Sequence, residues 1–227
     1  AYFPQLVAGP IVRAADFIPQ LDIEPKITTD TVARGIFLVL WGLFLKMVIA
    51  DNVAARADAL FASWQSNGLA ATWAAGLLFG VQIYCDFNGY SMIAIGLATM
   101  MGFWIQRNFR APYAAVGMSD FWARWHMSLS SWLRDYLYIP LGGNRKGRVR
   151  TYVNLMLTML LGGLWHGASI MFVLWGAIHG LGLVVERLIR SALGLKGKPG
   201  ERPAGGSWLG VRAAGLVCAD QFNQPRI

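Results

Sequence analysis

The segments SDFWARWHMSLSSWLRDYLYIPLGGNRKGR (residues 119–148) and LGGLWHGAS (residues 161–169) decide how the chain is interpreted. They place His126 and His166, with several tryptophans, arginines and an aspartate, in surroundings that are otherwise strongly apolar. A histidine or carboxylate in such surroundings loses hydration, so it persists where it is paired or faces a wet cavity. The sequence therefore predicts that the functional site of the protein lies in this region.

Composition indicates a membrane protein. Hydrophobic residues make up 56% of the chain and charged residues 14%, whereas soluble domains carry about 25% charged residues. The net charge of +8 would suggest nucleic acid as the partner of a soluble chain. Here the basic residues form short clusters between apolar runs, which is typical of loops that follow the positive-inside rule. We therefore expect a lipid bilayer as the partner and no nucleic acid.

Apolar runs predict an all-α, multi-pass transmembrane protein with re-entrant segments. Prolines break residues 2–21, which favours a re-entrant or interfacial segment, and Thr28 to Asp30 offer a helix start. The polar sequence CDFNG (residues 85–89) separates two short runs, so tilted, re-entrant and continuous helices all stay open. The five expected runs are 32–50, 69–84, 90–104, 152–164 and 169–185.

Between these runs, the sequence predicts two less apolar elements. Residues 51–68 are expected to form a short amphipathic helix or a loop outside the hydrocarbon. Residues 120–138 are expected to form one helix with Ser119 as N-cap. On that helix, His126 would lie at the edge of the apolar face, about 80° from its centre.

The basic residues predict topology and domain limits. Clusters before residue 152 and after residue 185 imply an out-and-back helical hairpin. Residues 1–190 are interpreted as the C-terminal part of a membrane domain and residues 191–227 as a poorly ordered Gly/Pro/basic tail. The abrupt start at Ala1, without an initiator methionine, is interpreted as that of a fragment.

The histidines have several interpretations: general base, metal ligand, proton relay or hydrogen-bonded structural residue. No metal site is expected, because His126, His166 and His179 lack ligand spacing and the two cysteines lie far apart. A serine nucleophile is disfavoured because no GxSxG motif is present. General-base chemistry is the best local option, with a structural histidine as its alternative, and His179 is the weakest candidate.

Four segments carry a resemblance to a known family: YFPQLVAGPIVR (2–13), DFNGYSMIAIGLA (86–98), DFWARWHMSLSSWLRDYLYIPLGGNR (120–145) and LWHGAS (164–169). They resemble the membrane-bound O-acyltransferase family, in particular its bacterial branch that acetylates alginate. The resemblance implies a funnel-shaped membrane fold in the bacterial inner membrane. It also implies His166 as catalytic base in the WHG motif and His126 as the second active-site histidine in the RWH motif.

The same resemblance implies substrates and partners. Trp165, Trp125, Arg134 and Asp135 are expected to bind substrate, with an ion pair as the structural alternative for the last two. The donor would be acetyl-CoA or an acyl-carrier thioester, used as a substrate, with no bound cofactor. The acceptor would be an exported polysaccharide such as alginate, with periplasmic acetyltransferases as partner proteins.

Other functions stay open at the level of sequence. Within the family, the alternative is transfer of D-alanine to teichoic acid. Outside it, the chain could be a transporter or channel whose histidines relay protons, or a scaffold for a secretion complex.

Overall fold

Helices form all the regular structure of residues 9–195, the residues that this computed structural model describes, which confirms the predicted all-α class. The chain divides into two units, the first ending at Asn108 and the second beginning at Phe109. Residues 1–8, which include the start of the YFPQLVAGPIVR motif (2–13), and residues 196–227, most of the predicted tail, lie outside the described part.

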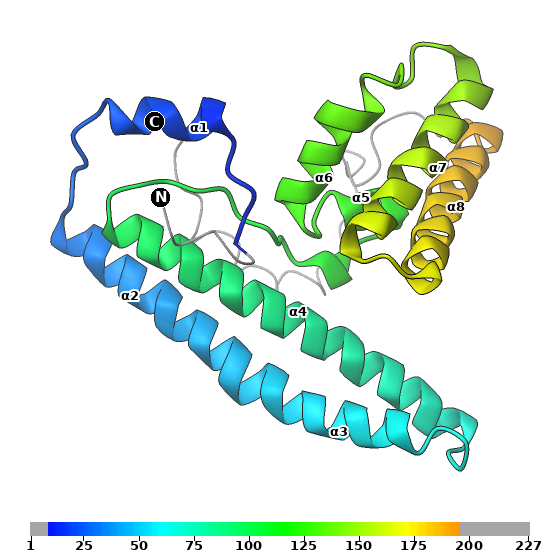
Figure 1. Cartoon of the computed structure of the whole chain (residues 1–227), viewed down its shortest axis with the longest axis horizontal. Helices are drawn as coiled ribbons and strands as arrows, with labels where there is room; N and C mark the ends of the chain where they lie inside the picture. Colours follow the sequence, from blue (N-terminus) through cyan, green and yellow to red (C-terminus); the bar gives the residue numbers. More distant parts are fainter. Residues whose placement is uncertain (1–8, 196–227) are drawn as a thin grey trace. The chain divides into compact units, whose positions relative to one another are not determined.

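The first unit is built on a long antiparallel helix pair (Figure 1). Its α2 begins where the sequence predicts, because the Thr28 side chain accepts a hydrogen bond from the Thr31 backbone and the Thr31 hydroxyl accepts one from the Thr28 backbone. This capping box satisfies donors that a helix start leaves open. The elements of the unit are α1 (Ala14–Leu21), α2 (Thr29–Leu43), π-helix η2 (Phe44–Ala50), α3 (Asp51–Ala62) and α4 (Leu69–Met100).

The CDFNG segment does not interrupt a helix, since α4 runs through it without a break. Of the three alternatives that the sequence leaves open, the continuous helix is the one observed. Asp86 forms an ion pair with Lys46 of η2, their charged atoms 2.8 Å apart. The carboxylate therefore has a partner on the neighbouring helix, which makes a polar residue tolerable inside a long apolar helix.

Glycines set the distance between α2 and α4. A Cβ on Gly42 would lie 2.5 Å from the carbonyl oxygen of Gly89, and a Cβ on Gly35 would lie 2.7 Å from that of Gly96. The members of each helix are seven residues apart, so they recur on one face after two turns. Small residues at such crossings let helix backbones approach closely, as in membrane helix pairs.

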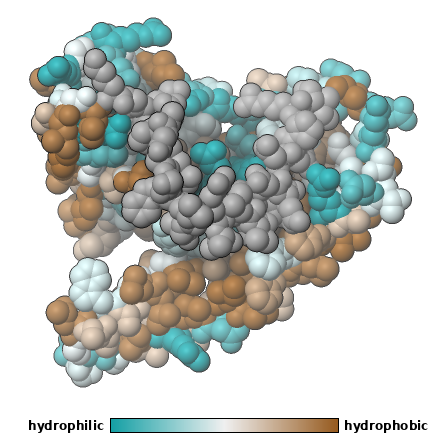
Figure 2. All heavy atoms as spheres, turned by 180° about the vertical axis from the view of Figure 1, so that it is seen from behind, coloured by the Kyte–Doolittle hydropathy of each residue, from teal (hydrophilic) through white to brown (hydrophobic). Residues whose placement is uncertain are grey.

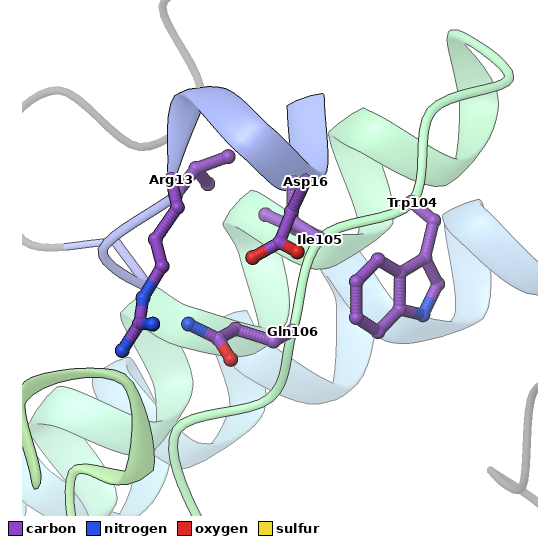
Figure 3. A pocket seen from close by; sticks show the side chains of 6 residues that line it. Arg13, Asp16, Trp104, Ile105 and Gln106 are labelled. Carbon is purple, nitrogen blue, oxygen red and sulfur yellow. The ribbon is translucent and has the colours of Figure 1, made fainter. Parts of the chain in front are cut away.

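The segment predicted to be re-entrant or interfacial contains the short helix α1, with Pro19 inside it. The Gln20 side-chain amide donates to the carbonyl of Trp104 at 3.0 Å and accepts from its backbone N–H at 2.8 Å. Figure 3 shows the shallow hollow beside this link, lined by Arg13, Asp16 and Gln106 among others. The contacts hold α1 against the segment that follows α4.

The second unit contains the two quoted histidine motifs. Its core is the antiparallel hairpin of α7 and α8, and the short helices α5 and α6 precede this hairpin in the sequence (Figure 1). Its elements are the 3-10 helix η3 (Pro112–Ala114), α5 (Met118–Trp122), α6 (Met127–Leu133), π-helix η4 (Arg134–Tyr138), α7 (Gly147–His166) and α8 (Ile170–Ala192).

The prediction of one helix over residues 120–138 is wrong. The helix breaks between Trp122 and Met127, where His126 adopts a left-handed backbone conformation with φ 42° and ψ 54°. Ser119 is not the N-cap, because Gly117 precedes the first helical residue and Ser119 lies inside α5. The angular position predicted for His126 therefore does not apply.

The hairpin predicted from the last two apolar runs is present as a packed antiparallel pair. Ser169 caps α8, its hydroxyl accepting from the backbone N–H of Met171 at 3.3 Å. A Cβ on Gly176 would lie 2.4 Å from the carbonyl oxygen of Met159, so α7 and α8 cross in close contact.

Three helical stretches are long and apolar enough to cross a membrane. They are Thr29–Ala62, Leu69–Met100 and Ile170–Ala192. Figure 2 shows hydrophobic residues spread over the outer surface of the long helix pair of the first unit. These helices indicate a membrane protein, and the number of crossings stays a prediction.

Candidate active site

His126 lies at the break between α5 and α6 and is buried, with 5% of its surface exposed. Its left-handed backbone is uncommon for a residue with a side chain and carries conformational strain. Its carbonyl accepts a hydrogen bond from the backbone N–H of Ser130 at 2.9 Å, and its Nδ1 lies 3.5 Å from the Ser128 hydroxyl. The surrounding structure thus holds the imidazole in one place.

The pKa of His126 is lowered to about 4, first by burial and second by the nearby His166. His126 lies outside the three candidate membrane helices. At neutral pH its imidazole is therefore uncharged, with one nitrogen able to donate and the other able to accept a hydrogen bond.

His166 is the last residue of α7; the residue is exposed as a whole, but aromatic rings cover part of its imidazole. Its ring centroid lies 5.2 Å from those of Trp165 and Trp175 and 6.1 Å from that of Phe172. Partial burial by these surroundings lowers the pKa of His166, which also lies outside the three candidate membrane helices. The carboxyl end of a helix dipole stabilises a cation, so α7 can stabilise the imidazolium that forms when His166 takes up a proton.

Trp165 joins the two histidines. Its ring centroid lies 6.3 Å from that of His126 and 5.2 Å from that of His166. The structure therefore brings together three of the six residues that the sequence predicts for the site, from the break before α6 and the end of α7. A buried neutral imidazole and an exposed one beside it can support proton transfer to and from a bound group.

Trp125 lies in an adjoining aromatic group. Its ring stacks on Phe121 with centroids 5.5 Å apart and meets Phe109 edge-on at 5.0 Å. This packing orients the residue immediately before His126. A direct role of Trp125 in substrate binding stays a prediction.

Arg134 and Asp135 pair with each other. The guanidinium donates two hydrogen bonds to the Asp135 carboxylate, at 2.7 Å from Nε and 3.2 Å from Nη2. This is the ion pair that the sequence offers as the structural interpretation of these residues. Their contact with a substrate stays a prediction.

Two carboxylates that support the site are not among the predicted site residues. Burial alone would raise the pKa of Asp120, but hydrogen bonds from Arg124 and the Val116 amide, together with the charges of Arg124 and Arg110, lower it overall. The four-residue spacing of Asp120 and Arg124 could have revealed this pair. Glu186 binds Ser119 across 67 residues of chain, which no local pattern signals.

His179 of α8 also belongs to the ring cluster, with its centroid 4.5 Å from that of Trp175 and 5.2 Å from that of Trp122. The sequence treats it as the weakest of the three histidines. Between residues 9 and 195, no group of three His, Cys, Asp or Glu side chains is arranged to hold a metal ion.

Comparisons with known proteins identify the family of the chain. The sequence model of the membrane-bound O-acyltransferase family matches residues 1–196. The chain is 49% identical to the probable alginate O-acetylase AlgI of Pseudomonas putida over 88% of this chain and 40% of that protein.

More distant relatives are named for other substrates. The chain is 43% identical to a peptidoglycan O-acetyltransferase of Helicobacter pylori, over 82% of this chain and 36% of that protein. It is 30% identical to a teichoic acid D-alanyltransferase of Streptococcus thermophilus, over 82% of this chain and 48% of that protein. The chain thus spans between 36% and 48% of the length of these three relatives.

Proposed function

The chain belongs to the membrane-bound O-acyltransferase family, and from this premise we propose that it is the part of an enzyme that acetylates hydroxyl groups of an exported polysaccharide such as alginate. The relatives named alginate O-acetylases are 48% or 49% identical to it, whereas the teichoic acid D-alanyltransferases are 27% or 30% identical. This difference favours acetyl transfer to a sugar hydroxyl over transfer of D-alanine.

His166 is the general base of the proposed reaction. Its imidazole takes the proton of the acceptor hydroxyl while the hydroxyl oxygen attacks the carbonyl carbon of an acyl thioester. The tetrahedral intermediate collapses, the carbon–sulfur bond breaks, and the leaving thiolate takes the proton back from the imidazolium. The position of His166 at the carboxyl end of α7 favours the transient positive charge.

His126 has a different task, because its pKa of about 4 keeps it neutral. A neutral imidazole cannot supply a full positive charge, but its N–H can donate a hydrogen bond to the oxyanion that develops on the thioester carbonyl. Burial and the left-handed backbone fix the ring in advance of substrate binding. We therefore assign His126 to orientation and oxyanion stabilisation.

The donor is proposed to be acetyl-CoA or an acyl-carrier thioester from the cytoplasm. Delivery of the product outside the cell implies the bacterial inner membrane and periplasmic acetyltransferases as partner proteins. Trp125, Arg134 and Asp135 are proposed to lie along the approach of these substrates, with the ion pair keeping the guanidinium of Arg134 oriented.

The observation that carries this proposal is the contact of His126 and His166 with the same Trp165 ring. The test is the acetyl content of exported polymer in cells that produce the full-length protein with wild-type His166 or with His166→Ala, at equal membrane levels. General acid–base catalysis contributes about 10²–10⁴-fold, so we expect acetylation to fall below detection.

Three results would contradict parts of the proposal. Unchanged acetylation in His166→Ala would remove His166 as the base. D-alanyl esters in place of acetyl esters in the wild-type product would change the acyl group and the acceptor. Proton flux that depends on His166, without any acyl transfer, would favour a transporter.

A further inference from the structure

The ring cluster of the second unit contains two polar atoms without a partner. Among the residues that the structure describes, Trp122 Nε1 and His179 Nδ1 are inaccessible to solvent and have no hydrogen-bond partner. Buried polar atoms without partners are rare and costly, and each such atom in a folded protein calls for a physical explanation. Neither atom has a part in the chemistry assigned to His126 and His166.

The two atoms belong to one constellation. The rings of Trp122 and His179 meet edge-on with centroids 5.2 Å apart, and Trp175 touches both, at 5.7 Å from Trp122 and 4.5 Å from His179. Phe121 also stacks on His179, with ring centroids 6.4 Å apart. Three aromatic rings therefore surround the imidazole of His179.

The constellation adjoins the candidate active site. Trp175 also lies 5.2 Å from His166, so one indole ring contacts both His166 and His179. Phe172, Trp175 and His179 stand at positions i, i+3 and i+7 of α8, which places them on one helix face. Helix α8 begins close to His166 and is a candidate membrane span. An ionisable residue inside such a span, as His179 is, is a candidate for a functional role.

The chemistry of the two atoms selects the group that fits them. An indole N–H only donates, whereas imidazole Nδ1 accepts or donates according to its tautomer. A hydroxyl group can accept a hydrogen bond from Trp122 Nε1–H and donate one to His179 Nδ1, and a carbonyl oxygen can accept from both when Nδ1 carries the proton. A single neutral oxygen therefore satisfies both atoms, and a cation does not.

We propose that Trp122 and His179 bind one neutral oxygen, a hydroxyl or carbonyl, of a substrate of the acyl transfer, one aromatic ring away from His166. The inference rests on the proposed function and extends it to a substrate-binding pair. The oxygen can come from the acyl donor or from the sugar acceptor, and steady-state kinetics with each substrate varied separately distinguishes the two sources.

The test compares ring-preserving variants of the full-length protein in membranes. Trp122→Phe removes the indole N–H, and His179→Phe removes both ring nitrogens. Trp132→Phe, on α6, is the matched control, since Trp132 packs on Tyr136 at 5.3 Å. A lost neutral hydrogen bond corresponds to about a 3- to 10-fold change, so we expect KM for one of the two substrates to rise by that factor in both variants and not in the control.

Two further variants sharpen the assignment. An asparagine amide reaches about as far as Nδ1 and a glutamine amide about as far as Nε2, so His179→Asn should raise KM less than His179→Gln. Because both residues bind the same oxygen, their effects should be coupled, so the double variant Trp122→Phe/His179→Phe should raise KM by less than the product of the two single-variant factors. Multiplied effects would mean that the two residues act on separate groups.

The outcomes separate this inference from the function on which it rests. If the wild-type protein acetylates polymer and both KM values stay unchanged in Trp122→Phe and His179→Phe, the pair does not bind substrate. A fall in thermal stability with unchanged KM would indicate a structural water or another protein group on these atoms, and would also overturn the inference. If the wild-type protein transfers no acyl group at all, it is the proposed function that fails.

Discussion

Glu186 of α8 accepts two hydrogen bonds from Ser119 of α5, at 2.7 Å from the backbone N–H and 2.9 Å from the hydroxyl. The carboxylate lies so close to Gly117 that a Cβ there would be 2.6 Å from its Oε1. Since α5 leads into the break that contains His126, Glu186 fixes the start of the segment that positions this histidine.

Removing that carboxylate should destabilise the protein. Hydrogen bonds to charged groups contribute about 1.5–3 kcal/mol, and Glu186 is half-buried, so we expect Glu186→Ala to lose about 1–3 kcal/mol. Glu186→Gln keeps one acceptor oxygen and should lose less. Thermal unfolding in detergent micelles measures both. The control is Glu24→Ala, at an exposed position, and an equal melting temperature for Glu186→Ala and this control would contradict the role of Glu186.

His126 predicts how stability depends on pH. Its pKa in the folded protein is lowered to about 4, whereas an unfolded histidine titrates near pH 6.5. As the pH falls, the unfolded chain therefore binds the proton first. This contribution to stability is fully present above pH 6.5 and is lost as the pH falls towards 4, by up to about 3 kcal/mol.

The comparison that isolates this effect is His126→Asn. Asparagine tolerates the left-handed backbone better than most residues and does not titrate. Melting temperatures between pH 7.5 and 4.5 should fall less steeply in His126→Asn than in the wild-type protein. Parallel curves for the two proteins would show that the burial of His126 does not govern the acid response.

Local signals predicted the long helices well and the histidine segment poorly. The cap at Thr28 and the apolar runs are readable because they depend on neighbouring residues. The break at His126 could not be predicted from the sequence. The segment ARWHMS contains neither glycine nor proline, which are the usual signs of an interrupted helix. Tertiary packing imposes the left-handed backbone there.

For the candidate site, the sequence and the family resemblance identified His126, His166 and Trp165, which the structure brings together. They did not identify Glu186, because its partner lies 67 residues away. Nor did they reveal the shared environment of Trp122 and His179, because contacts between α5 and α8 depend on how the hairpin packs. Contacts between residues so far apart in the sequence become visible only in the three-dimensional structure.

The crossing of α2 and α4 predicts opposite effects for the same substitution at two places on one helix. A Cβ on Gly89 would lie 2.7 Å from the carbonyl oxygen of Gly42, whereas a Cβ on Gly76 meets nothing within 4 Å. Overpacking costs about 1–3 kcal/mol, and alanine improves an open helical position by up to about 1 kcal/mol. We expect Gly89→Ala to lower the melting temperature and Gly76→Ala to keep or raise it. A fall of equal size in both variants would rule out close packing as the cause.

Lys46 of η2 pairs with two carboxylates, those of Asp51 at the start of α3 and of Asp86 in α4. Its Nζ lies 2.7 Å from Asp51 Oδ1 and 2.8 Å from Asp86 Oδ1, and only the second pair links η2 to α4. Lys46→Met would leave both acids without this partner inside candidate membrane helices, where unpaired charges are costly. The side chains are about half exposed, so we expect a loss of about 1 kcal/mol.

A double variant tests whether the pairing of Lys46 with Asp86 stabilises the helix pair. Adding Asp86→Asn to Lys46→Met removes one uncompensated charge and should restore part of the melting temperature, giving a coupling of about 0.5–1 kcal/mol. The control is Arg34→Met, which breaks an ion pair with Asp30 four residues away on the surface of α2. Such exposed pairs contribute about 0.3–0.5 kcal/mol. Lys46 would have no special role across the helix pair if its loss equalled that of Arg34 and Asp86→Asn restored nothing.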